Sequence, residues 1–246
     1  MCLKIKNGAI FIADSHEDEK KDDFYNFLKK IDLKELKTEQ LFLMGDMFDL
    51  LIGEVEYGVK EYEKYIKLID KIALNIEVIY FEGNHDFELK SLFKNVKVIS
   101  LSKQPQKSIL EDNTIVYLSH GDKYADLIHT LYTRLIRSKC ILKILNKIDR
   151  INNYKISKKI KKSQLKKDIC KKIDNFEGLI SSKLSLYKVQ KGNYIVEGHY
   201  HQCYQFEERG INYINLPSFA CNQSYFIVEC LKRNKFTQCR LRGSNV

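Results

Sequence analysis

The sequence has few chain-breaking residues and no long apolar run. Two prolines and eleven glycines among 246 residues leave little room for a disordered linker. No apolar stretch approaches the roughly 18–20 residues that a membrane-spanning helix requires. The short apolar run near the N-terminus continues directly into polar residues, so we expect a first core strand there rather than a signal peptide. A chain of this length can bury a substantial core, and we expect residues 1–246 to form a single domain.

The cysteines show no metal-binding or disulfide pattern. None of the seven forms a CxxC pair, and their number is odd. They are Cys2, Cys140, Cys170, Cys203, Cys221, Cys230 and Cys239. We therefore expect neither a structural zinc site nor a disulfide framework, but reduced thiols in a cytoplasmic protein.

Short apolar runs bounded by polar residues or glycine predict eight strands. They cover residues 9–14, 41–46, 78–84, 114–122, 193–201, 211–217, 224–230 and 236–241. Between the first three, apolar residues recur with the spacing i, i+3, i+4, i+7, which predicts helices over 24–31 and 62–69. Strands that alternate with helices indicate a layered α/β fold. The closely spaced strands near the C-terminus indicate a second, antiparallel sheet.

The stretch 123–185 differs from the rest in charge and periodicity. The chain has a net charge of +10, yet residues 137–172 contain fourteen Lys and Arg against two acids. Two amphipathic stripes of apolar residues predict helices there. They are Ile141, Ile144, Leu145, Ile148 and Ile151, then Ile156, Ile160, Leu165, Ile169 and Ile173. We predict a basic helical insertion over 123–185 that approaches something anionic, although a solvated lysine-rich face would show the same composition.

Polar side chains of similar kinds follow five of the predicted strands. The segments are Asp14-Ser15-His16, Gly45-Asp46-Met47-Phe48-Asp49, Gly83-Asn84-His85-Asp86, His120-Gly121-Asp122 and Gly198-His199-Tyr200-His201. Any one alone is weak, since G-D-x-x-D is a plausible turn and a single histidine is usually a surface residue. In open α/β sheets, ligands bind beyond the carboxyl ends of the strands. Five such segments at strand ends therefore predict one site.

Carboxylates, imidazoles and one amide are the ligands that a pair of divalent cations requires. Two cations about 4 Å apart can stabilise both the attacking and the leaving oxygen of an in-line displacement at phosphorus. Asp46 is the natural bridging carboxylate. We expect Asp14, His16 and His201 to complete the first cation's shell, and Asn84, His120 and His199 to complete the second. Oxygen and imidazole ligands suit Mn²⁺, our first choice, and also Fe²⁺ or Zn²⁺.

This ordered set of motifs resembles the calcineurin-like metallophosphoesterase superfamily. The resemblance spans residues 14–201 and implies a four-layer α/β/β/α sandwich with the ligand set given above. It also implies that His85 protonates the leaving oxygen or stabilises the transition state. Asp86 would orient the imidazole ring of His85.

The position of the insertion resembles the helical lid of the UDP-2,3-diacylglucosamine pyrophosphohydrolases of lipid A synthesis. That resemblance implies hydrolysis of UDP-2,3-diacylglucosamine to UMP and lipid X (2,3-diacylglucosamine 1-phosphate). The acyl chains would occupy the apolar stripes, and the lysines would face an anionic membrane surface. By position, Asp122, Tyr124, Tyr132 and Arg134 are candidates for contact with substrate. One departure is that this family commonly has Gly-Asn-Arg-Asp where this chain has His85.

We accordingly expect a cytoplasmic enzyme, peripheral on the inner membrane, with a lipid-linked nucleotide as substrate. No stable nucleic-acid partner is expected, because the insertion lacks the interleaved aromatic residues used for base stacking, and no protein partner is predicted. The alternatives are another metallophosphoesterase, such as a nuclease, nucleotide phosphodiesterase or pyrophosphatase, and a scaffold without metals. The scaffold is disfavoured because no ligand position is replaced.

Overall fold

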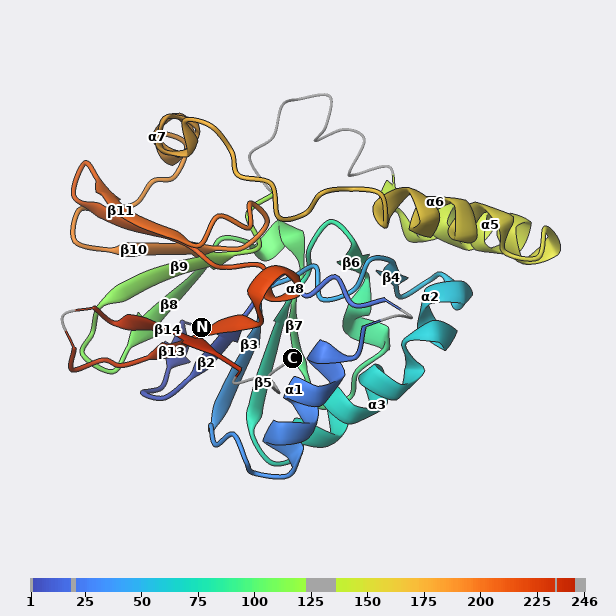
Figure 1. The fold of residues 1–246 in the computed structure, drawn as a ribbon, viewed down its shortest axis with the longest axis horizontal. Helices are drawn as coiled ribbons and strands as arrows, with labels where there is room; N and C mark the ends of the chain where they lie inside the picture. Colours follow the sequence, from blue (N-terminus) through green and yellow to red (C-terminus); the bar gives the residue numbers. More distant parts are fainter. Residues whose placement is uncertain (1, 19–20, 123–135, 233, 242–246) are drawn as a thin grey trace.

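The structure, a computed structural model, describes residues 2–18, 21–122, 136–232 and 234–241. Two six-stranded sheets face each other, and helices cover their outer sides (Figure 1). Sheet I has the order β14 (Phe236–Arg240), β13 (Ser224–Val228), β2 (Ile10–Ile12), β3 (Gln40–Leu43), β5 (Glu77–Phe81) and β7 (Lys97–Ile99). Sheet II has the order β1 (Leu3–Ile5), β8 (Gln106–Leu110), β9 (Ile115–Ser119), β10 (Tyr194–Glu197), β12 (Ile211–Asn215) and β11 (Tyr204–Glu208).

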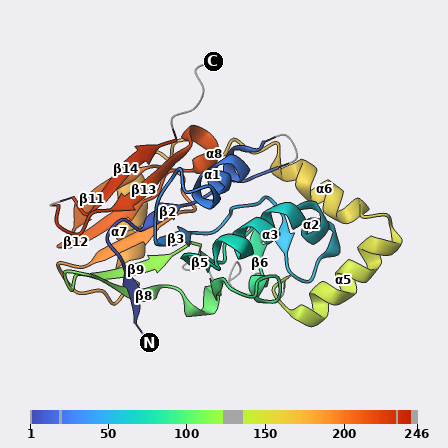
Figure 2. The ribbon, with the colours of Figure 1, turned by 90° about the horizontal axis from the view of Figure 1, so that it is seen from below.

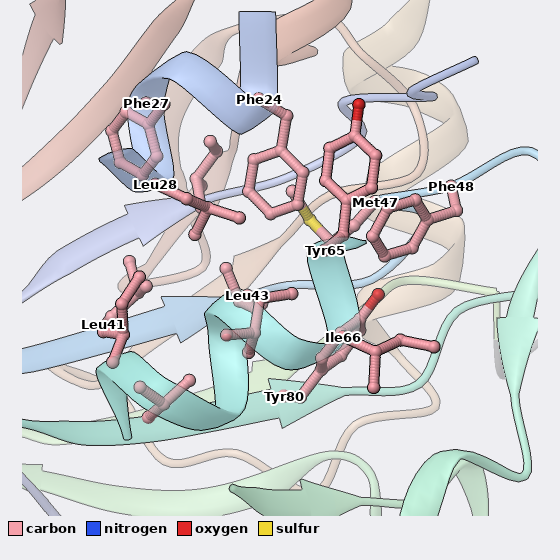
Figure 3. Close-up of a cluster of buried hydrophobic side chains, with 14 of the residues drawn as sticks. Phe24, Phe27, Leu28, Leu41, Leu43, Met47, Phe48, Tyr65, Ile66 and Tyr80 are labelled. Carbon is pink, nitrogen blue, oxygen red and sulfur yellow. The ribbon is translucent and has the colours of Figure 1, made fainter. Parts of the chain in front are cut away.

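The outer face of sheet I is covered by α1 (Asp23–Asp32) and α3 (Glu63–Ile72). The apolar residues that predicted these helices are buried against β3 and β5, as Figure 3 shows for Phe24, Phe27 and Ile66. Met47 and Phe48, which directly follow the predicted ligand Asp46, lie in the same cluster. The loop after β3 is therefore anchored in the core by apolar side chains.

A second cluster fills the space between the two sheets. Alternate residues of the strands point into it, for example Phe11 and Phe42 from sheet I and Val116 and Val196 from sheet II. A third cluster packs α7 (Phe176–Leu184) against the outer face of sheet II. The layers therefore run helix, sheet, sheet, helix, and the predicted α/β/β/α sandwich is confirmed.

All eight predicted strands are present, although each is shorter than predicted. The sequence did not reveal β1, β7, β8 and β11. The prediction that the C-terminal strands form one antiparallel sheet is wrong. Strand β12 pairs in parallel with β10 in sheet II, whereas β13 joins sheet I through an antiparallel pairing with β2. Strand spacing along the chain does not determine which sheet edge is free to accept a strand.

The described part of the predicted insertion contains α5 (Lys139–Ile151), α6 (Lys155–Gln164) and α7. Helices α5 and α6 form a hairpin beside α2 (Glu56–Glu61) at one end of the molecule (Figures 1 and 2). A buried ion pair between Lys161 and Glu61 fastens α6 to α2. The role of this region as a lid stays a prediction.

The expectation that every cysteine is a reduced thiol is wrong. Cys170, after α6, forms a disulfide with Cys221 in α8 (Phe219–Asn222). The two residues are 51 positions apart, and the fold alone brings their Cα atoms to 5.8 Å. Across the described residues, no helix is both long enough and apolar enough to cross a bilayer.

Candidate metal centre

Loops from both sheets meet to form the candidate site. The backbone N–H groups of Asp14 and His16, after β2, donate to the carbonyls of Gly45 and Asp46, after β3. In sheet II, the backbone N–H of His199, after β10, donates to the carboxylate of Asp14 at 3.0 and 3.1 Å. The five strand ends therefore meet as predicted, but they belong to two facing sheets and not to one open sheet.

Close packing of these loops depends on glycine. A Cβ atom on Gly45, whose φ is +93°, would lie 2.5 Å from Nδ1 of His120. A Cβ atom on Gly198 would lie 2.6 Å from Oδ2 of Asp14. Any larger residue at either position would push a predicted ligand out of place.

One donor cluster consists of Asp14, His16 and His201, whose ligand atoms lie within 4.8 Å of one another. Nε2 of His201 is 3.2 Å from Oδ1 of Asp14 and 3.4 Å from Nε2 of His16. All three side chains are mostly buried. This grouping is the one expected for the first cation.

The second donor cluster consists of Asp46, His120 and His199, again within 4.8 Å. Nε2 of His120 is 3.3 Å from Oδ2 of Asp46 and 3.2 Å from Oδ1 of Asn84. Asn84 therefore adds an amide oxygen to this cluster, as the sequence analysis proposed. That these residues bind metal stays a prediction.

The imidazoles are held in orientations that suit metal binding. Nδ1 of His120 donates to the backbone carbonyl of Met44 at 3.0 Å, and Nδ1 of His201 donates to that of Ile169 at 2.6 Å. A carbonyl can only accept, so the Nε2 lone pair of each neutral ring faces its cluster. The same pattern holds for His16, whose Nδ1 lies 3.0 Å from Oδ1 of Asp49.

The electrostatics of the clusters also fit divalent cations. Burial and the neighbouring His120 lower the pKa of His199 to about 4, so this ring is neutral and can act as a ligand. Although burial opposes it, the Asp46 carboxylate raises the pKa of His120 well above its ordinary value. Within the described residues, the ion-pair partners of the buried Asp14 and Asp46 are all imidazoles. A bound cation would displace the proton from His120, and buried carboxylates with imidazole nitrogens and no thiolate suit Mn²⁺, Fe²⁺ or Zn²⁺.

The backbone of the site is strained. Asp14, His16, Asp46, His199 and His201 all have positive φ, between 41° and 65°. Such conformations are costly for residues other than glycine and are concentrated at functional sites. The surrounding hydrogen bonds therefore hold these five side chains where an unconstrained loop would not.

His85 lies between the two clusters. Its ring centroid is 5.3 Å from that of His16, and its Nε2 is 4.0 Å from Oδ2 of Asp46. Nδ1 of His85 donates to the backbone carbonyl of Asp49 at 3.1 Å. The structure therefore assigns the orientation of the His85 ring to Asp49 and not to Asp86.

Asp86 has a different role from the predicted one, and the assignment as orienter of His85 is corrected. Its carboxylate is fully buried and accepts four hydrogen bonds, from the backbone N–H groups of Gly83, Asp46 and Met47 and from the Tyr80 hydroxyl. Burial, together with the Asp46 carboxylate, raises its pKa to about 7. Asp86 thus ties the loop after β5 to the loop that carries Asp46.

Asp122 is buried beside Arg137, with Oδ2 at 3.6 Å from Nη2 of the guanidinium. The same guanidinium donates to the Gly83 carbonyl at 2.7 Å. Asp122 therefore lies behind the site and is not among the described residues that line the cavity. The other predicted substrate contacts, Tyr124, Tyr132 and Arg134, lie outside the described residues.

A cavity of about 580 Å³ opens over both clusters. Its wall includes His16, Asp46, His85, His199 and His201, with Lys167, Lys171 and Lys172 from the segment that follows α6. A neighbouring cavity of about 390 Å³ has a mainly apolar wall. The two cavities share Asp49, Asn84, His85, Gln164 and Lys167.

The apolar stripes of the insertion divide between two environments. Leu145, Ile156 and Ile160 line the apolar cavity, and the binding of acyl chains there stays a prediction. Ile144 and Ile151 are 61% and 74% exposed and do not line this cavity. The apolar stripe predicted on α5 therefore faces the cavity only in part.

Several residues beside the donor clusters were not predicted to have a role in the site. Asp49 belongs to the segment Gly45–Asp49, and its position three residues after Asp46 could have suggested a hydrogen-bond partner for His16. Arg137 and Lys183 come from the insertion, and no local pattern distinguishes them from the many other basic residues there. Their partners become visible only in the folded chain.

Comparisons of sequence and structure identify known proteins that are similar to this chain. The chain is 24% identical to the UDP-2,3-diacylglucosamine hydrolase of Psychromonas ingrahamii over 211 residues, which cover 82% of this chain and 84% of that protein. It is 23% identical to the hydrolase of the same name from Haemophilus influenzae over 224 residues, covering 87% and 91%. Among solved structures, the Escherichia coli phosphoesterase Yfce has 13% identity and a TM-score of 0.45, covering 94% of this chain and 98% of that one. The family model of the calcineurin-like phosphoesterases matches residues 9–203, a range that includes both donor clusters, and the protein belongs to this family.

Proposed function

We propose that the protein is a metal-dependent hydrolase that cleaves the pyrophosphate bond of UDP-2,3-diacylglucosamine, releasing UMP and 2,3-diacylglucosamine 1-phosphate. The observation that supports this most directly is the pair of cavities that share a wall. One contains the metal-donor clusters, and the other is apolar. A substrate with a pyrophosphate next to acyl chains would place one part in each. The names of the similar hydrolases support the same substrate.

Bound in the two clusters, divalent cations would polarise the phosphorus oxygens and lower the pKa of water toward neutrality. His85 faces the same cavity, where its imidazolium form, protonated at both nitrogens, can donate the Nε2 proton to the leaving phosphate oxygen. The Asp49 carbonyl fixes the orientation of the His85 ring, so the ring donates this proton in one defined orientation. The neutral amide of Asn84 adds a donor without repelling an anionic substrate.

The lysines that line the cavity would contact the substrate anion. Lys167, Lys171 and Lys172 are exposed residues of the segment after α6, opposite the donor clusters. Their positive charge would offset the repulsion between the pyrophosphate and the carboxylates of the site. This segment is fixed in place, because its Ile169 carbonyl accepts from His201 and its Cys170 is joined to α8.

We further propose that the α5–α6 hairpin contacts an anionic membrane surface at the cytoplasmic face of the inner membrane. Ile144, Ile148 and Ile151 are exposed on α5, and lysines flank them on both helices. Exposed apolar residues beside basic ones are typical of helices that lie in a membrane interface. Each lysine near an anionic surface contributes about 1 kcal/mol.

A substrate comparison tests the proposal. The purified protein with Mn²⁺ is given UDP-2,3-diacylglucosamine or UDP-N-acetylglucosamine, and UMP release is measured. We expect a much higher kcat/KM for the acylated substrate, and a loss of this preference in Ile160→Glu, which places a charge in the apolar cavity. Leu74→Glu, at an exposed apolar residue just after α3 and outside that cavity, is the matched control. Equal rates on both substrates would reject the acyl-chain assignment.

A second candidate is a nuclease or nucleotide phosphodiesterase, favoured by the lysine-lined wall of the larger cavity. In that case bis(p-nitrophenyl) phosphate and single-stranded nucleic acid would be cleaved while UDP-2,3-diacylglucosamine would not. Affinity for nucleic acid would also fall steeply with salt.

A further inference from the structure

Lys183 is a buried cation next to the second donor cluster. It belongs to α7, within the segment that the sequence analysis treated as a basic insertion, yet only 7% of its side chain is exposed. Burial of a lysine is rare and costly unless its ammonium group is paired. Its Nζ donates to the carbonyl of Gly121 at 2.6 Å and to Oε2 of Glu197 at 2.8 Å, and it lies 5.0 Å from the ring centroid of Tyr200.

The three contacts join the two loops that present the histidines. Gly121 directly follows His120, and Glu197 lies two residues before His199. Tyr200 stands between His199 and His201. One ammonium group therefore contacts the loop after β9, the end of β10 and Tyr200 in the loop after β10.

These loops are in direct contact at the point where Lys183 binds. Gly121 has a φ of +125°, and a Cβ atom on it would lie 3.1 Å from Cβ of His199. The Lys183 hydrogen bond fixes the peptide that packs against His199. A change in the position of this peptide would move His120 and His199 relative to each other.

Glu197 makes the arrangement rigid. Its carboxylate is fully buried and accepts hydrogen bonds from the hydroxyls of Ser119, Tyr187 and Tyr213 in addition to Lys183. The donors come from β9, β12 and the segment after α7. The buried ammonium is thus held by a carboxylate that is itself fixed on several sides.

A buried ion pair can also be an ordinary part of the core, and replacement by apolar residues can then be neutral. Two contacts argue for a role in the site. Nζ donates to the Gly121 carbonyl as well as to Glu197, so its contacts extend beyond the ion pair. Its third neighbour, Tyr200, is flanked by two predicted ligands.

We propose that Lys183 is a positioning residue that fixes the distance between the loops of His120 and His199, and so sets the affinity of the second donor cluster for its cation. The inference rests on the proposed metal-dependent function. It assigns to α7 a direct effect on the metal centre.

The test compares variants by calorimetric titration of the chelator-treated protein with Mn²⁺. Lys183→Met alone leaves Glu197 buried without its cation and is expected to fold poorly. The double variant Lys183→Met/Glu197→Gln removes both charges, keeps an acceptor for the hydroxyls and is the main variant. Lys188→Met, an exposed lysine just after α7, is the matched control. Leu184→Ala, in the apolar cluster of α7, lowers stability while keeping the hydrogen bonds of Lys183 to Gly121 and Glu197.

We expect the double variant to lose about tenfold or more in affinity at one of two Mn²⁺ sites, the usual effect of removing support behind a metal ligand. Lys183→Arg keeps the positive charge and should bind Mn²⁺ more tightly than the double variant. Excess Mn²⁺ should restore hydrolysis of bis(p-nitrophenyl) phosphate by the double variant. Mn²⁺ affinity within twofold of wild type in the double variant would overturn the inference. An equal loss in Leu184→Ala would also overturn it. Failure of the proposed function would appear separately, as absence of Mn²⁺ binding in the wild-type protein.

Discussion

Three of the donor histidines are held in orientation by a hydrogen bond from the ring nitrogen that faces away from the cluster. His120 and His201 use backbone carbonyls for this purpose, whereas His16 uses the carboxylate of Asp49. A carboxylate partner makes the ring a stronger donor and fixes its tautomer. The ring of His16 therefore depends on a side chain that can be replaced without changing the backbone.

Asp49→Asn should weaken Mn²⁺ binding at the cluster of Asp14, His16 and His201 by about 10- to 100-fold, because the amide no longer fixes the ring through an ionic hydrogen bond. Titration calorimetry would measure the change. Asp32→Asn, which removes an ion pair with Lys71 far from the site, is the control. Unchanged Mn²⁺ affinity in Asp49→Asn would show that His16 does not depend on this contact.

His85→Asn should separate catalysis from metal binding. His85 belongs to neither donor cluster, so the protein should bind Mn²⁺ as before. Loss of a general acid lowers kcat by about 10²- to 10⁴-fold. Steady-state rates on UDP-2,3-diacylglucosamine or bis(p-nitrophenyl) phosphate would measure the effect. If Mn²⁺ binding fell with the rate, His85 would have to be counted among the ligands.

The ligand candidates could be predicted because each directly follows an apolar run, and the carboxyl end of a strand is readable from sequence. The partner of Asp86 could not be predicted in the same way. Its neighbour in the chain is His85, but its hydrogen bonds reach Asp46 and Met47, forty residues away. Lys183 gave no signal at all, because a buried lysine and a solvated one look alike in a lysine-rich sequence.

Strands show a similar division between what the sequence reveals and what it does not. The central strands β2, β3, β5, β9 and β10 are mostly buried and each contains a run of at least three apolar residues, so they were evident. The strands that were missed lie at sheet edges or next to them, where residues alternate or are polar. Such segments become strands because a neighbour offers free backbone groups, which is a property of the assembled sheet.

The disulfide links two segments that both support the first donor cluster. Cys170 follows Ile169, whose carbonyl orients His201, and Cys221 lies in α8, where the Ala220 N–H donates to the Asp14 carbonyl. Disulfides are rare in a reducing cytoplasm. Reduction of this disulfide would therefore leave the segment after α6, which lines the cavity, less firmly attached to α8.

Cys170→Ser should lower the free energy of unfolding by about 2–4 kcal/mol, because the bond closes a loop of 51 residues and restricts the unfolded chain. We also expect weaker Mn²⁺ binding at the cluster that contains His201. Denaturant unfolding and titration calorimetry would measure both. Cys140→Ser, an exposed free cysteine on α5, is the control. Treatment of the wild-type protein with a dithiol should reproduce the variant, and stability unaffected by either change would contradict the assignment.

Charge and exposed apolar surface coincide at one end of the molecule. The net charge of +10 arises from residues 137–172, and the exposed isoleucines of α5 lie in the same stretch. The donor clusters open beside this end, because α6 contributes to the wall of their cavity and both α5 and α6 line the neighbouring apolar cavity. A membrane contact there would bring the site close to a substrate whose acyl chains lie in the bilayer.

Binding to vesicles should therefore depend on both charge and apolar contact. We expect the protein to sediment with vesicles that contain anionic phospholipid and not with neutral ones. Ile144→Glu/Ile151→Glu should reduce this binding, because two exposed apolar side chains are replaced by charges that anionic lipid repels. The matched control is Leu33→Glu/Leu74→Glu, two similarly exposed leucines after α1 and α3 that belong to neither helix of the hairpin. Raising salt from 0.1 M to 1 M shortens the screening length from about 10 Å to about 3 Å and should release most of the wild-type protein. Equal loss of binding in both double variants would show that the α5–α6 hairpin is not the contact surface, and the location of the enzyme would then have to be explained by its substrate alone.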